Sequence, residues 1–168
     1  EETGRGGVRF AGGAELAGKF VGHLFDGAQE AVFVLMTIGP SLERRVSRML
    51  AEGETVEAFI LDAVGSAAAL NLLTHFLEEV EGDTKARGWH AGTCLSPGQT
   101  FWDVTGQELI FQALPGRSIG VELMESSFLR PQKSQSAVIP LGPDLKVHGD
   151  SGASCRYCPA TRCALRRE

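Results

Sequence analysis

The sequence predicts an α+β fold in a single domain, with an antiparallel sheet and flanking helices. Helical periodicity fills most of the first half of the chain, whereas two short runs that look like strands come late, at 119–123 and 137–141. These two runs are close enough in sequence to pair antiparallel, which favours α+β over a doubly wound parallel sheet. With 168 residues, 43 % of them apolar, the chain is long enough for one core. We expect this domain to span residues 1–145, followed by a cysteine-rich tail at 146–168 that folds back on it.

The first half of the chain predicts a loop, a helix, a strand and a second helix. Glycines make the first thirteen residues loop-like, and apolar residues from Leu16 to Phe25 then fall on one helical face that ends near Gly27. The continuous apolar run at 31–37 predicts a strand buried on both faces. Pro40 is suited to a helix start, so we expect the next helix to run from there to Gly53.

A long helix is predicted between residues 54 and 80. Its apolar positions form a stripe that we expect to face the core. They are Val56, Phe59, Ile60, Ala63, Val64, Ala67, Leu70, Leu73, Phe76, Leu77 and Val80. Small residues at 65–69 would let another backbone or a partner helix approach closely. The longest unbroken apolar run, Ala31 to Met36, is far shorter than the roughly 20 residues that span a bilayer, so we expect no membrane segment.

The second half begins with a long loop at 82–104, and long loops in compact domains tend to be functional. Thr105 and Glu108 have the spacing of a capping box, which predicts a helix that ends at 115–116. The strands at 119–123 and 137–141 follow, joined by the polar loop 125–136. Trp102 is expected either to anchor its loop in the core or to contact a bound ring.

Charge and cysteine usage limit the function classes. A net charge of −5 argues against general nucleic-acid binding. The four cysteines are not spread as an even disulfide framework, so we expect a reducing, cytoplasmic location. Because the chain begins Glu-Glu-Thr-Gly, we expect it to start inside a longer gene product.

Three of the four cysteines lie at the end of the chain, at Cys155, Cys158 and Cys163. This C-x2-C-x4-C spacing can bring three thiolates to one centre, which predicts an iron–sulfur cluster, most simply a [4Fe–4S] cluster, or alternatively zinc. A redox disulfide between the first two, or inert thiols, are the other interpretations. A fourth ligand is usual, and Cys94 is the first candidate, with His148 or an open iron site next.

Three segments together resemble a known family. They are Ile60 to Ser66, Leu95 to Gly98 with Trp102-Asp103 after it, and Ile119 to Pro131 followed by Lys133-Ser134. In this combination they are similar to the activation domain of vitamin-B12-dependent methionine synthase, and more closely to stand-alone relatives that accompany corrinoid methyltransferases. The resemblance implies an α+β domain that cradles S-adenosylmethionine against a corrinoid (cobalamin-binding) protein and supports reductive methylation of cobalt.

The resemblance also implies the ligand-site residues. The loop Ser96, Pro97, Gly98 and Gln99 matches the family's methyl-donor loop, and Glu125 matches its acidic position. The family has an arginine four residues before the glycine and a tyrosine directly after it, whereas this chain has Cys94 and Gln99 there. Neither residue replaces a bidentate arginine or a packed aromatic ring, so we expect weak or absent binding of S-adenosylmethionine.

These observations predict an accessory protein of corrinoid-dependent methyl transfer. It would bind an iron–sulfur cluster through its cysteines, dock on a corrinoid protein or methyltransferase, and reactivate cobalt by reduction. Two alternatives stay open: an activation domain that binds S-adenosylmethionine, and an interaction module with structural zinc.

Overall fold

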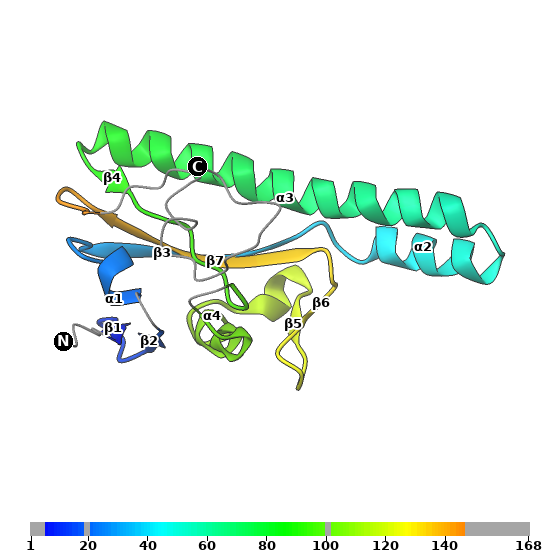
Figure 1. Cartoon of the computed structure of the whole chain (residues 1–168), viewed down its shortest axis with the longest axis horizontal. Helices are drawn as coiled ribbons and strands as arrows, with labels where there is room; N and C mark the ends of the chain where they lie inside the picture. The colour runs from blue at the N-terminus through cyan, green and yellow to red at the C-terminus, as the bar shows by residue number, and fades with distance from the viewer. Residues whose placement is uncertain (1–5, 19–20, 100–101, 147–168) are drawn as a thin grey trace, which may run out of the picture.

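The computed structural model describes residues 6–18, 21–99 and 102–146, which form strands and helices in mixed order along the chain (Figure 1). The strands are β1 (Gly7–Arg9), β2 (Glu15–Ala17), β3 (Glu30–Thr37), β4 (His90–Ala91), β5 (Glu122–Leu123), β6 (Leu129–Arg130) and β7 (Ser134–Gly142). The helices are α1 (Val21–Leu24), α2 (Ser41–Ala51), α3 (Thr55–Ala86) and α4 (Gln107–Ala113), with 3-10 turns η1 (Val104–Gly106) and η2 (Gly116–Ile119). The α+β class predicted from the sequence is confirmed.

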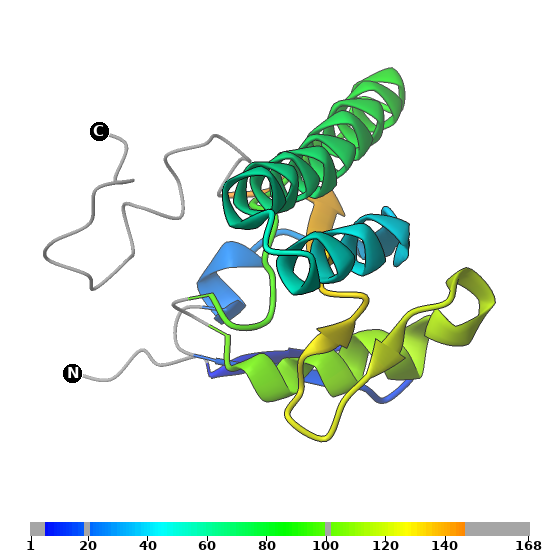
Figure 2. The same ribbon diagram turned by 90° about the vertical axis from the view of Figure 1, so that its right-hand side faces the viewer.

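The central sheet has the strand order β3-β7-β4, and all of its neighbours are antiparallel. β3 pairs with β7 along its whole length, from Glu30 opposite Leu141 to Thr37 opposite Ser134. The C-terminal half of α3 covers one face of the sheet, and α2 lies beside the N-terminal half of α3, past the end of the sheet (Figure 1). Helix α4, the β5–β6 hairpin and the N-terminal elements lie on the other face (Figures 1 and 2). The sheet is therefore the middle of three layers.

Alternation along β7 gives each face of the sheet its own hydrophobic cluster. Ala137 and Ile139 pack with Leu73 and Val80 of α3, whereas Val138 packs with Ile110 of α4 on the other side. Successive side chains of a strand point to opposite faces, so a central strand buried on both sides reads as a continuous apolar run. This is why residues 137–141 contain no charged residue.

The predicted pairing of 119–123 with 137–141 is wrong. β7 pairs with β3, and the shorter β5 pairs with β6 in a separate hairpin, with Glu122 opposite Arg130 and Leu123 opposite Leu129. Ile119 belongs to η2 rather than to a strand. β7 is the central strand, bonded to β3 on one edge and to β4 on the other. The eight residues of β3 match the nine of β7 in length, whereas β5 has only two.

The N-terminal prediction of a loop and then a helix is only partly correct. Residues 7–9 form β1, and Leu16, assigned from the sequence to a helix, lies in β2 with its side chain fully buried. The helix itself is the single turn α1. Leu16 and Leu24 both pack in the hydrophobic cluster on the α4 side of the sheet. The apolar residues predicted to lie on one helix are therefore buried, but from the β1–β2 ribbon and the single turn α1.

The predictions for β3 and α2 are confirmed, with β3 at 30–37 and α2 starting directly after Pro40. The predicted capping box of α4 is wrong. Asp103, two residues before the predicted cap, accepts hydrogen bonds from the Thr105 N–H at 2.9 Å and the Thr105 hydroxyl at 2.7 Å. These two bonds lower the pKa of Asp103. A carboxylate accepts more strongly than a hydroxyl, and it starts η1, which leads into α4.

Helix α3 runs six residues further than predicted, to Ala86. Its small residues permit the close approach that the sequence predicts: a Cβ on Gly65 would lie 2.6 Å from Leu42 Cδ2 of α2. The prediction that its apolar stripe faces the core is wrong for the N-terminal half, because that half projects with α2 past the end of the sheet (Figure 1). Val56, Phe59, Ile60, Val64 and Leu70 are all more than half exposed.

By length and composition, α3 could cross a membrane, although the sequence-based expectation was that no segment could. Single polar residues interrupt this mainly apolar stretch, so it contains no long unbroken apolar run. The criterion of length and composition is weak evidence for a single helix. Leu73 and Val80 of the same helix are buried against the sheet, so its C-terminal half is part of the folded domain.

Candidate functional site

The loop that carries the predicted residues Ser96, Pro97, Gly98 and Gln99 is a tight turn fixed to the sheet. Leu95 exchanges backbone hydrogen bonds with Val138 of β7, at 3.0 and 2.8 Å. The Gln99 N–H then donates to the Ser96 carbonyl at 3.1 Å, and Gly98 has a φ of 87°. Proline followed by a residue of positive φ is typical of a type II turn, and glycine adopts that φ without strain.

Trp102 holds the far end of this loop. Its carbonyl accepts a hydrogen bond from the Gly98 N–H at 2.9 Å, and its side chain is only 4 % exposed. The ring packs against the backbone of Gly106. Of the two roles predicted for Trp102, the structure supports the anchoring one, because a buried ring cannot present its face to a cofactor.

A second wall comes from the β5–β6 hairpin. Met124 N–H donates to the Phe128 carbonyl at 2.9 Å, and Ser127 has a φ of 61°. Positive φ at a residue other than glycine is uncommon and recurs at ligand sites. Phe128 is 65 % exposed, so the hairpin carries an unshielded aromatic ring at its tip.

The turn and the hairpin enclose a pocket of about 620 Å³ with the start of β7. Its lining residues are Ser96, Pro97, Gly98, Gln99, Val104, Gln107, Met124, Ser127, Phe128, Leu129, Gln132, Ser134, Gln135 and Ser136. The volume lies in the range of small-molecule sites. None of these side chains is ionisable, so the pocket offers amides, hydroxyls, backbone groups and apolar surface, and no charge to pair with a charged ligand.

Gln107 lines this pocket with a buried side-chain oxygen that lacks a hydrogen-bond partner among the described residues. It is 6 % exposed, and its Oε1 has no hydrogen-bond partner. A buried carboxamide oxygen without a partner costs about 1 to 3 kcal/mol, which a ligand donor could offset. The sequence pattern at 105–108 predicts only a helix cap and gives no indication of a role for Gln107.

Lys133 holds the β7 wall of the pocket against α2 and α3. Its Nζ lies 2.8 Å from Asp62 Oδ1 and 2.9 Å from Ser66 Oγ, both on α3. Its backbone N–H donates to Glu43 Oε1 of α2 at 2.8 Å. The side chain of Lys133 is only 10 % exposed, so this contact fixes where β7 begins relative to the helical layer.

Glu125 lies in the hairpin loop between Met124 and Ser127 but is not among the residues that line the pocket. It is exposed. The structure therefore brings Ser96, Pro97, Gly98 and Gln99 together with the hairpin, and leaves Glu125 outside the pocket lining.

Cys94 faces the other side of the sheet. It packs against the cluster that includes Leu73 and Val80 of α3, whereas the next residue, Leu95, packs in the cluster on the pocket side. Burial raises the pKa of Cys94 to about 11, so the apolar surroundings favour the neutral thiol. A cluster that used Cys94 as a ligand would lie on the α3 side of the sheet rather than in the pocket.

The other predicted metal ligands, Cys155, Cys158 and Cys163, lie outside the described residues, as does His148. Within residues 6–18, 21–99 and 102–146, no group of three or more His, Cys, Asp or Glu side chains could hold a metal ion. The metal-site prediction thus rests on the spacing of the three C-terminal cysteines.

No protein-family model matches the chain, and no curated protein has a significantly similar sequence. The resemblance to the methionine synthase activation domain therefore stays a prediction.

Proposed function

We propose that this chain is an accessory protein of corrinoid-dependent methyl transfer, which binds an iron–sulfur cluster through Cys155, Cys158 and Cys163 and reactivates cobalt by one-electron reduction. The observation that carries the proposal is the C-x2-C-x4-C motif, in a chain where two of the three resemblance-bearing segments, 95–98 and 119–134, meet around one pocket, while the third, 60–66, lies on α3. A reducing cytoplasm, where thiolates persist, is the compartment that this function requires.

The chemistry of the pocket supports a corrinoid as the neighbouring group. The rim of a corrinoid carries neutral amide side chains, which donate and accept hydrogen bonds but need no counter-charge. Gln99, Gln107, Gln132 and Gln135 are amides of the same kind, and Met124 and Phe128 add apolar contact surface at the pocket. Amide–amide pairing would satisfy the Oε1 of Gln107 that has no partner within the described chain.

The same lining argues against S-adenosylmethionine as the main ligand. Its carboxylate and sulfonium are charged, and the pocket has no ionisable side chain to pair with either. Losing one charge-assisted pair costs about 1.5 to 3 kcal/mol, roughly a ten- to hundredfold loss of affinity. We therefore predict no binding of S-adenosylmethionine in the low micromolar range by calorimetry, and such binding would instead favour the activation-domain alternative.

Electron transfer to free cob(II)alamin tests the proposal directly. The protein is reduced anaerobically, freed of excess reductant and mixed with cob(II)alamin and methyl iodide. The reduced protein loses one electron and Co(II) gains it, and the resulting Co(I) displaces iodide from methyl iodide to give methylcobalamin. Formation of methylcobalamin in proportion to the protein is the expected result.

Two variants distinguish the role of the cysteine tail from the role of the pocket. Cys158→Ser should abolish the reaction together with the bound iron, because a hydroxyl is a far poorer iron ligand than a thiolate. Gln107→Met should keep the iron but raise the cob(II)alamin concentration that gives half the maximal rate. A wild-type protein that contains zinc and forms no methylcobalamin would refute the proposal and favour the structural zinc module.

A further inference from the structure

Helix α3 is apolar on two opposite faces. One face packs against α2 and the sheet through Ala58, Gly65, Ala69, Leu73 and Val80, all of them buried. A second set of residues, all exposed, lies on the other face. These are Val56, Ile60, Ala63, Ala67, Leu70 and Thr74. At 100° per residue, each lies within about 40° of the point diametrically opposite Gly65.

This second set, which we call the α3 seam, has the spacing of a coiled-coil interface. The steps between its members are four, three, four, three and four residues, the alternation that keeps side chains on one line along a helix. Phe59 and Val64 flank it and are 75 % and 55 % exposed. A helix that is apolar all round is normally covered on all sides, so the exposed α3 seam is a candidate contact surface.

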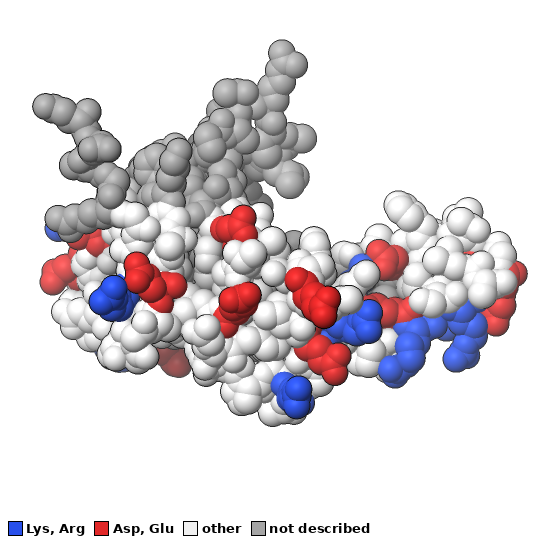
Figure 3. Space-filling model, turned by 90° about the horizontal axis from the view of Figure 1, so that it is seen from below, with Lys and Arg blue, Asp and Glu red and all other residues white. Residues whose placement is uncertain are grey.

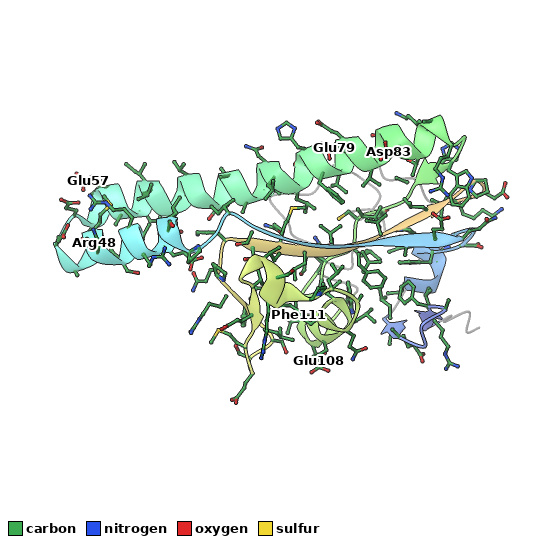
Figure 4. The ribbon with its side chains drawn as sticks, turned by 180° about the vertical axis from the view of Figure 1, so that it is seen from behind. Arg48, Glu57, Glu79, Asp83, Glu108 and Phe111 are labelled. Atoms are coloured by element: carbon green, nitrogen blue, oxygen red, sulfur yellow. The ribbon has the colours of Figure 1, made fainter. Side chains whose placement is uncertain are left out.

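The charges around the α3 seam argue against a lipid surface. Asp62 and His75 are the only ionisable residues between 58 and 77, and Asp62 is held by Lys133. Acidic residues bound the seam at both ends of α3, with Glu57 at one end and Glu79 and Asp83 toward the other (Figure 4). Anionic headgroups would repel them, whereas membrane-surface helices carry basic residues beside their apolar face.

The basic side chains of α2 do not lie along the α3 seam. Lys and Arg side chains gather at the α2 end of the molecule when it is seen from below, on the side away from the outer surface of α3 (Figure 3). The exposed arginines of α2 are Arg44, Arg45 and Arg48. They therefore do not provide the basic border that a membrane-binding seam would need.

We propose that the α3 seam binds the same seam of a second copy of this chain, with the two helices antiparallel about a two-fold axis. The side-chain sizes are self-complementary in this arrangement. Ile60 lies opposite the second copy's Leu70, and Ala63 lies opposite its Ala67, with Val56 opposite its Thr74. Small residues at the axis let the two backbones approach, and large ones fill the space on either side. Antiparallel helix dipoles also attract each other.

The extent of the seam fits a modest but specific dimer. From Val56 to Glu78 the helix is about 33 Å long. Burying an aliphatic side chain completely removes roughly 60 to 120 Å² from water, and five large apolar residues here are 55 % to 75 % exposed. At these exposures the five residues of both copies together remove roughly 400 to 800 Å² from water. Even with the alanines between them, the interface lies below the roughly 1,200 Å² of standard stable interfaces, in the range of weak association. We expect dissociation in the micromolar range.

Sedimentation equilibrium of the full chain tests this dimer. Wild-type protein should approach twice the 17.9 kDa chain mass at high micromolar concentration. Ile60→Lys and Leu70→Glu should each raise the dissociation constant at least about 100-fold, because each forces a charge against an apolar side chain. His75→Lys is the matched control: it adds a positive charge on the same helix, beside the seam, and should leave association unchanged.

Mixing the two variants tests the register. In a mixed dimer the introduced lysine faces the introduced glutamate across the axis, while the native Leu70 and Ile60 meet at the other crossing. The 1:1 mixture of Ile60→Lys and Leu70→Glu should therefore associate at concentrations where each variant alone is a monomer. A monomeric wild type, dimers that persist in both variants, a mixture that stays monomeric, or wild type that binds phosphatidylcholine–phosphatidylserine vesicles rather than itself would each overturn the proposal.

Discussion

Replacing Gly106 by alanine should destabilise the domain by releasing the ring that anchors the pocket loop. A Cβ at this position would lie 2.8 Å from Trp102 Cδ1, and closer still to Nε1 and Cε2 of the indole. Gly106 has φ −58° and ψ −9°, which alanine adopts freely, so the effect comes from packing and not from backbone strain. The ring is 4 % exposed and rigid, and it cannot move aside without disturbing the cluster around Ile110.

The expected loss of stability in Gly106→Ala can be estimated from the cost of inserting atoms into a well-packed core. Inserting one methyl group into such a site costs about 1 to 3 kcal/mol, which for a domain of this size lowers the melting temperature by roughly 2 to 10 °C. Urea unfolding followed by far-UV circular dichroism measures the loss in free energy of unfolding. Tryptophan fluorescence reports on Trp102 and Trp89, the two tryptophans of the chain.

Gly82→Ala is the matched control. Gly82 lies inside α3, and nothing lies within 4 Å of a Cβ added there. Removing a glycine from a helix interior should stabilise the protein by about 0.5 to 1 kcal/mol. The two identical substitutions thus have opposite predicted signs. A Gly106→Ala protein as stable as wild type would refute the packing of Trp102 on Gly106, and with it the anchoring of the 96–99 turn.

The remaining predictions concern two buried ionisable groups. Burial raises the pKa of Cys94 from 9.0 to about 11, so the unfolded chain ionises first and stability should fall as the pH rises from about 9 to about 11, by on the order of 2 kcal/mol. Cys94→Ala should remove that part of the pH dependence, and superimposable pH curves would contradict the burial of the thiol. Lys133→Met should cost about 1 to 2 kcal/mol, because it leaves Asp62 and Ser66 without their partner. Adding Asp62→Asn should recover part of this loss in urea unfolding, whereas strictly additive losses would show that the two side chains do not interact.

Strong local signals made much of the fold predictable. The apolar run ending at Gly39-Pro40 gave β3 and the start of α2, and the small residue at Gly65 correctly indicated close packing, which Leu42 provides. Strand pairing was not predictable in the same way. Residues 137–141 pair with a strand about a hundred residues earlier, and local patterns do not specify such distant partners.

The candidate site was also predictable only where its residues have a local sequence signature. The Pro97-Gly98 turn has a local signature, and it lines the pocket. The opposite wall comes from the β5–β6 hairpin, and Gln107 enters only because α4 packs beneath the turn. The direction of Cys94 depends on the register of Leu95 with Val138, and a register shift of one residue would have turned its side chain to the pocket side.

The iron and acid-labile sulfide content of anaerobically purified protein, measured with its visible absorption spectrum, tests the central claim most directly. We predict a brown protein with iron and sulfide in near-equal amounts, both lost in Cys158→Ser, and a lower content in Cys94→Ser if Cys94 is the fourth ligand. An unaltered content in Cys94→Ser would favour His148 or an open site. A colourless protein with one zinc per chain would contradict the proposed iron–sulfur cluster.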